Sequence, residues 1–231
     1  MNSDILDLLG GELTAVKANE QLGIFLLDGS GSMDDIGEFN ISLAENVGRV
    51  FKDFVSTRFK TSSIKEEFQI AVINFDYEAV VRVPRIAVTD FDDFADYNPR
   101  DESKDNPGTF IGGGLLKAKE IIDDFFAQPN PDEYPRSVVI AILTDGMCQL
   151  PKETSQIARE LDSNPNVTIS CGLFTTRERE HKGINTEVKN FLQMIKSKAG
   201  VYGVIENNEV LRKFFKASMA AIPTKKKESD V

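Results

Sequence analysis

The sequence predicts one α/β domain: a Rossmann-like, doubly wound, mainly parallel sheet with one antiparallel edge strand and helices on both faces. Short apolar runs alternate with amphipathic helical patterns along the chain, an order typical of parallel sheets. Several runs are apolar at every position, as expected of strands buried on both faces. Hydrophobic residues make up 41% of the 231 residues, enough for one large core, and no linker-like break divides the chain.

The first predicted strand covers residues 22–27 (LGIFLL) and ends at a turn of aspartate, glycine and serine, residues 28–32. Beyond this turn, apolar residues recur from Ile36 to Val55 at the spacing of one helix face. This pattern predicts a helix that starts near Ile36.

Two further apolar runs, residues 68–75 and 79–83, predict a hairpin. We expect its second strand at the sheet edge and expect Pro84 to end that strand, because proline cannot donate a ladder hydrogen bond. Residues 84–108 then form a long, Asp-rich connection in which a short helix begins at Asp90.

The remaining patterns alternate regularly between helix and strand. They predict a helix over 115–126, a strand over 137–143, a helix over 152–161, a strand over 167–174, a helix over 188–195, a strand over 201–205 and a helix over 210–219. We therefore divide the chain into an N-terminal extension (1–19), one domain (20–222) and a disordered tail (223–231).

The charge and cysteine content restrict the classes of partner and compartment. A net charge of −10 repels phosphate backbones, so nucleic acid is not expected to bind. Only two cysteines are present, Cys148 and Cys171, which indicates buried free thiols in a reducing cytoplasm. Without a signal peptide or an apolar run long enough to span a membrane, we expect a soluble cytoplasmic protein that is monomeric on its own.

Asp28, Ser30 and Ser32 place three oxygen-bearing side chains two residues apart, directly after a buried strand. In a glycine-permitted loop, alternate side chains can point into one concavity. A carboxylate with two hydroxyls suits Mg²⁺, Mn²⁺ or Ca²⁺ rather than zinc or copper. The alternative is a turn whose aspartate and serines cap the helix that follows.

Asp145 and Thr109 are candidates for the same site. Asp145 also ends a buried strand, and ligands of open α/β sheets collect at the carboxyl ends of strands where the strand order reverses. If the strands before Asp28 and Asp145 are neighbours, a divalent cation would neutralise the two carboxylates. Thr109 lies directly before a helix, where it is either a third hydroxyl ligand or a plain helix cap.

In this order and strand context, Asp28-x-Ser30-x-Ser32, Thr109 within Gly-Thr-x-x-Gly, and Asp145 within Thr-Asp-Gly resemble the metal-ion-dependent adhesion site of von Willebrand factor A domains. The resemblance covers about residues 20–220. It implies that the two serines and Thr109 bind the ion directly in the open state, while the aspartates act partly through water. One coordination position would stay free for a partner's Asp or Glu.

The resemblance implies a function in binding, not catalysis. We expect a Mg²⁺-dependent protein-interaction module, with Ca²⁺ or Mn²⁺ as alternatives. Gly29, Gly31 and Met33 are expected to line the rim beside the ion. Within the family, the chain resembles stand-alone bacterial and phage proteins associated with tellurium resistance or with MoxR-type AAA+ ATPases, which implies a subunit of a cytoplasmic complex.

Two other functions stay open, a metal-dependent hydrolase or phosphotransferase and a structural subunit with a vestigial site. The phosphotransferases in which an aspartate follows a buried strand need a second carboxylate two residues on, where this chain has Ser30. No Walker loop or glycine-rich dinucleotide motif is present. The single histidine, His181, lies in a charged stretch typical of solvated surface and not of a catalytic base.

Overall fold

The computed structural model describes residues 19–63, 65–101, 108–131, 133–175 and 185–221. Six strands form one sheet in the order β3-β2-β1-β4-β5-β6. Their bounds are β1 (Glu20–Asp28), β2 (Phe68–Phe75), β3 (Ala79–Ala87), β4 (Arg136–Thr144), β5 (Val167–Phe174) and β6 (Tyr202–Ile205). Only β3 runs antiparallel to its neighbour, and it lies at the sheet edge, as the sequence predicts.

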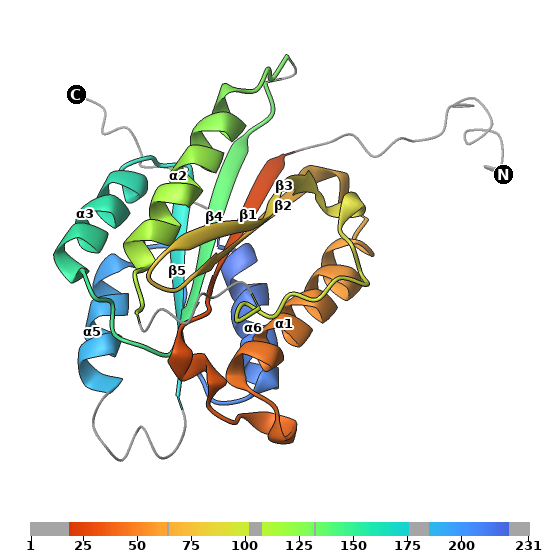
Figure 1. Ribbon diagram of the computed structural model, residues 1–231. Helices are drawn as coiled ribbons and strands as arrows, with labels where there is room; N and C mark the ends of the chain where they lie inside the picture. Colours follow the sequence, from red (N-terminus) through yellow and green to blue (C-terminus); the bar gives the residue numbers. More distant parts are fainter. Residues whose placement is uncertain (1–18, 64, 102–107, 132, 176–184, 222–231) are drawn as a thin grey trace, which may run out of the picture.

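Helices cover both faces of the sheet (Figure 1). Helices α1 (Leu43–Phe54) and α6 (Asn208–Met219) pack on one face. Helices α2 (Ile111–Ala127), α3 (Pro151–Asp162) and α5 (Asn185–Ile195) pack on the other. The predicted α/β class with a Rossmann-like, mainly parallel sheet is confirmed.

The central strand β1 shows why its sequence is apolar at every position. Ile24 and Leu26 belong to the core under α2 and α3, whereas Phe25 and Leu27 belong to the core under α1 and α6. All four side chains are completely buried. On the α1 side, the rings of Phe25 and Phe51 meet edge to face at 4.8 Å, so aromatic packing adds to the burial.

The predicted start of the first helix is wrong. Helix α1 begins at Leu43, where the Ser42 side chain accepts a hydrogen bond from the backbone N–H of Glu45 at 3.1 Å. Before this cap, Phe39 and Asn40 both adopt a φ of 59°, which interrupts a right-handed helix. The Phe39 side chain is 80% exposed. Its place in the apolar pattern therefore does not correspond to a contact with the core.

Two expectations for the edge strand and the acidic connection are also wrong. Strand β3 continues through Pro84 to Ala87, with a register shift opposite the stretch of β2 between Ile70 and Val72. Proline is tolerated there because, at an irregular position of an edge strand, no ladder hydrogen bond requires an N–H donor. The expected helix from Asp90 is a 3-10 turn over Val88–Asp90 that ends at that residue.

Three further expectations concern the cysteines, the C-terminal tail with His181, and membrane-spanning segments. Cys148 and Cys171 are both buried free thiols, as predicted. The tail and His181 lie outside the described residues. Among the described residues, no helix is long and apolar enough to cross a membrane.

The strand order creates a switch point beside β1. The chain passes from β1 to β2 on one side, and later returns to β4 on the other side of β1. Leu27 of β1 pairs with Leu143 of β4, so the carboxyl ends of these two strands lie side by side. Ligands of open α/β sheets bind at such a point.

Candidate metal centre

The switch point brings together Asp28, the last residue of β1, and Asp145, the residue after β4. Their relative exposures are 0% and 3%. The two carboxylates at the ends of these adjacent strands are therefore both buried away from water. A buried charged group destabilises the fold unless an opposite charge or hydrogen bonds compensate it.

Hydrogen bonds fix the orientation of the Asp28 carboxylate. Its Oδ1 accepts from the backbone N–H of Ser30 at 2.8 Å, and its Oδ2 accepts from the Thr144 hydroxyl at 2.5 Å. The Ser30 hydroxyl lies 3.2 Å from the Ser32 hydroxyl, which donates to Asp145 Oδ1 at 2.6 Å. The loop after β1 thus links Asp28 to Asp145 through the backbone N–H and hydroxyl of Ser30 and the hydroxyl of Ser32.

Two backbone hydrogen bonds hold Thr109 near the same place. The N–H of Phe110 donates to the Asp76 carbonyl at 2.7 Å, and the N–H of Gln149 donates to the Thr109 carbonyl at 2.9 Å. A Cβ placed on Gly146 would lie 3.0 Å from Thr109 Oγ1 and 3.8 Å from Ser32 Oγ. Both hydroxyls therefore border the space beside Gly146, and the structure brings all five predicted side chains to one locality.

Helix capping does not explain these hydroxyls. Ser30 precedes the 3-10 turn Gly31–Asp34 but makes no side-chain capping bond to it. The capping position of α2 is Phe110, not Thr109, and it too lacks a side-chain capping bond.

The electrostatics of Asp28 would favour a cation close to its carboxylate. Burial, and secondarily the negative charge of Asp145, raise the pKa of Asp28 from 3.8 to about 7, although the bonds from Thr144 and Ser30 oppose the rise. A divalent cation between the two carboxylates would offset both the burial of the Asp28 charge and its repulsion from Asp145.

The donor set is also the right kind for a hard cation. Two carboxylates and three hydroxyls offer only oxygen, which suits Mg²⁺, Ca²⁺ and Mn²⁺. The part of the chain that the structure describes contains no group of three or more His, Cys, Asp or Glu side chains that could hold a metal ion. The hydroxyls are therefore needed to complete a site, and the residues present fit one of this type.

A strap formed by Pro99 and Arg100 supports the loop from outside. A Cβ on Gly29 would lie only 2.4 Å from the Pro99 carbonyl oxygen, so the two backbones are in tight contact. Arg100 Nε donates to both Asp34 carboxylate oxygens at 3.1 and 3.0 Å, and its Nη1 donates to the Gly29 carbonyl at 3.3 Å. The loop after β1 is thus clamped by a segment about 70 residues away in sequence.

Sequence reasoning missed the supporting residues Thr144, Asp76 and Arg100. The role of Thr144 could have been predicted, because a hydroxyl at the end of the strand next to Asp28 can donate a hydrogen bond to the Asp28 carboxylate. Asp76 and Arg100 act through contacts that no local pattern reveals. The expectation that Met33 lines the rim is wrong, because its side chain is completely buried in the α1 core. Gly31, in contrast, faces open space.

Comparison with known proteins bears on the fold. No protein-family model matches the sequence, and no curated protein matches it. Among solved structures, proximal thread matrix protein 1 from the mussel byssus is similar with a TM-score of 0.59 and 20% identity, over 87% of this chain and 47% of that one. The pilus adhesin SpaC from Lactobacillus rhamnosus GG is similar with a TM-score of 0.65 and 12% identity, over 87% and 30%.

A third similar structure is the conserved hypothetical protein BatB from Bacteroides thetaiotaomicron, with a TM-score of 0.54 and 17% identity, over 87% of this chain and 99% of that one. The chain spans less than half the length of the mussel protein and of SpaC. The mussel protein has also been solved with its MIDAS motif occupied by zinc. These proteins have von Willebrand factor A–like folds, and the chain described here has that fold.

Proposed function

We propose that the chain is a non-catalytic protein-interaction module that depends on a divalent cation. Asp28, Ser30, Ser32, Thr109 and Asp145 would hold the ion, and an Asp or Glu of the partner would complete its coordination. The observation that carries the proposal is the pair of buried carboxylates at the ends of adjacent strands, linked by serine hydroxyls. The zinc-occupied MIDAS motif of the mussel protein, whose fold is similar, supports it.

The residues around the ion have distinct tasks. Asp28 and Asp145 balance the charge of a dication, whereas the neutral hydroxyls of Ser30, Ser32 and Thr109 add none. A bound cation would therefore supply an electrophilic position that attracts a third carboxylate. Thr144 and the N–H of Ser30 keep the Asp28 carboxylate turned toward the site.

Mg²⁺ is our first choice of ion, with Ca²⁺ and Mn²⁺ as alternatives, because these cations prefer oxygen ligands. The mussel protein adds zinc to the ions that a titration should include. A cytoplasmic location, and a place in a bacterial complex for stress or metal resistance or beside an AAA+ ATPase, stay predictions from the sequence.

The cheapest test is a thermal-melt titration of the full chain with Mg²⁺. A hundredfold excess over the dissociation constant is expected to stabilise the fold by about 3 kcal/mol, which corresponds to about 6–12 °C in Tm. The Ser30→Ala, Ser32→Ala double variant is expected to show little or none of this rise. Ser163→Ala, which changes an exposed serine at the end of α3, is the matched control and should respond as wild type does.

The same variants test the interaction. Partner recovery from native lysate is expected to fall with chelator and in the double variant, but not in Ser163→Ala. Equal Mg²⁺ responses in all three proteins would exclude the proposed site. Chelator-independent recovery would leave a cation site without a role in binding.

Cation binding is expected to weaken as the pH falls from about 8 to about 6. Burial beside Asp145 raises the pKa of Asp28 to about 7, so below that pH the ion must displace a proton. The apparent association constant should then fall by up to about tenfold per pH unit. Calorimetry in buffers of different ionisation enthalpy would count about one released proton at pH 6 and almost none at pH 8. An affinity that is constant over this range would contradict the prediction.

A further inference from the structure

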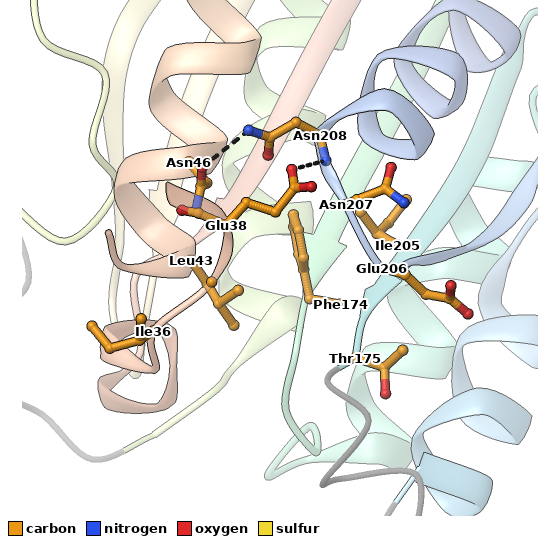
Figure 2. A pocket seen from close by; sticks show the side chains of 11 residues that line it. Ile36, Glu38, Leu43, Asn46, Phe174, Thr175, Ile205, Glu206, Asn207 and Asn208 are labelled. Carbon is orange, nitrogen blue, oxygen red and sulfur yellow. Dashed lines mark hydrogen bonds between the residues drawn. The ribbon is translucent and has the colours of Figure 1, made fainter. Parts of the chain in front are cut away.

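A cleft of about 480 Å³ opens at the carboxyl ends of β5 and β6, between the start of α1 and the start of α6 (Figure 2). Its volume lies in the range of ligand-binding pockets, about 300–1,000 Å³. Leu43, Phe174 and Ile205 contribute an apolar floor, and all three are buried. The floor of the cleft can therefore pack against the aliphatic part of a side chain that enters it.

The polar lining of the cleft carries only negative charge among the described residues. Glu38 and Glu206 line it together with asparagine and threonine side chains, and the lining includes no Lys, Arg or His. In Figure 2 the Glu38 carboxylate lies at one end of the Phe174 ring, and the Glu206 carboxylate lies farther from that ring. Glu206 is exposed and forms no ion pair within the described part of the chain, so its charge is not neutralised there.

Hydrogen bonds hold the wall of the cleft that carries Glu38. Glu38 Oε2 accepts from the backbone N–H of Asn208 at 2.8 Å, at the first turn of α6. The Asn208 side chain donates to Asn46 Oδ1 at 3.1 Å, and Asn46 donates to the Glu38 carbonyl at 3.2 Å. These bonds, drawn in part in Figure 2, tie the loop before α1 to α6 and fix the carboxylate in the cleft wall.

The cleft lies close to the candidate metal centre. Thr144 of β4 pairs with Leu173 of β5, so Asp145 and Phe174 follow at the same level of neighbouring strands. Adjacent strands are about 4.8 Å apart. Glu38 also belongs to the connection that carries Ser30 and Ser32. One extended peptide can therefore reach both places along the carboxyl edge of the sheet.

We propose that this cleft is a subsite for a basic side chain, Arg or Lys, of the same partner that presents an acidic side chain to the metal. The aliphatic stem would pack on Leu43 and Phe174, and the cationic head would meet the carboxylates of Glu38 and Glu206. The partner segment thus pairs an acidic with a basic residue at a fixed spacing. Only the acidic half of this recognition rests on the proposed function.

Selection of random linear peptides on the immobilised, Mg²⁺-loaded full chain tests the proposal. Enriched peptides are expected to contain Arg or Lys at a constant spacing from Asp or Glu. Replacing that basic residue by Met, which keeps the stem, should weaken binding about tenfold, as should Glu206→Gln on the protein. Glu206→Lys should weaken binding further, and a peptide with Glu in place of the basic residue should restore it.

Glu209→Lys is the matched control, because it makes the same charge change three residues along, on an exposed side chain outside the cleft. It should leave peptide affinity within about twofold of wild type. Equal losses in Glu206→Lys and Glu209→Lys, or selected peptides without a basic preference, would overturn the subsite. A selection that enriches no peptide would count against both proposals.

Chelator separates the two proposals. Peptides that need Mg²⁺ and an acidic residue but tolerate loss of the basic one would refute the cleft alone. Peptides that keep the basic requirement and its sensitivity to Glu206→Lys without Mg²⁺ would support the cleft and refute the metal-dependent function.

Discussion

An Asp28→Asn variant is expected to be more stable than wild type in the absence of cations and to gain no stability from them. Burial and the charge of Asp145 raise the pKa of Asp28 from 3.8 to about 7. A displacement of this size corresponds to about 4 kcal/mol of destabilisation once the carboxyl group is ionised. Asparagine removes the charge but weakens one of the bonds from Thr144 and Ser30, a loss of about 1–2 kcal/mol.

The net gain should therefore be about 2 kcal/mol above pH 7, or about 4–8 °C in Tm. Because the folded-state pKa of Asp28 is raised, its favourable contribution is complete below pH 3.8 and is lost as the pH rises to about 7. The advantage of the variant over wild type should grow over that window. Melting curves with chelator at several pH values measure it.

Asp93→Asn supplies a control of opposite sign. Its carboxylate accepts a hydrogen bond from Lys60 Nζ, which is the main reason that the pKa of Asp93 is lowered. Neutralising Asp93 should therefore reduce stability at neutral pH, and the deficit should shrink as acid protonates the wild-type group. An Asp28→Asn protein that is less stable than wild type at pH 8 in chelator would show that its charge is compensated within the protein.

Gly29→Ala is expected to damage the candidate metal centre far more than Gly31→Ala, although both change the same loop. The new Cβ at Gly29 would lie 2.4 Å from the Pro99 carbonyl oxygen, and a backbone atom cannot move aside cheaply. Overpacking of this kind costs about 1–3 kcal/mol or more. At Gly31 nothing lies within 4 Å of the added carbon.

The Gly29→Ala change should also reduce cation affinity by about 10- to 100-fold, as loss of outer supporting contacts does at metal sites. It separates the loop from Pro99 and lengthens the bond from Arg100 to the Gly29 carbonyl. Calorimetric Mg²⁺ titration and melting curves measure the two effects separately. Equal affinities in the two variants would mean that the strap does not position the ligands.

Much of the fold could be predicted because strands and helices here are determined by local patterns. The continuous apolar runs that became β1, β4 and β5 are buried on both faces, so their composition identifies them without knowledge of their neighbours. Periodicity failed at Ile36 and Phe39, which fit the helix spacing but are 61% and 80% exposed. There, a capping serine and two positive φ angles outweigh the apolar pattern.

The candidate site could be predicted as a set of residue types but not as an arrangement. Spacing and strand context bring Asp28, Ser30 and Ser32 into one loop, and the switch-point rule predicts Asp145 beside them. For Thr109 the sequence left two roles open, and the structure excludes the helix cap. Nothing local predicted that Pro99 and Arg100 would clamp the loop.

The sequence by itself determined where the buried strands lie, which loops carry oxygen-bearing side chains and how much negative charge the protein bears. Tertiary structure alone decided which strand ends meet, that Met33 turns inward, and that a cleft with two carboxylates opens beside β5. The physical reason is the distance along the chain over which each effect acts. Backbone propensity and burial periodicity act over a few residues, whereas convergence and desolvation of charges arise only when distant segments pack against one another.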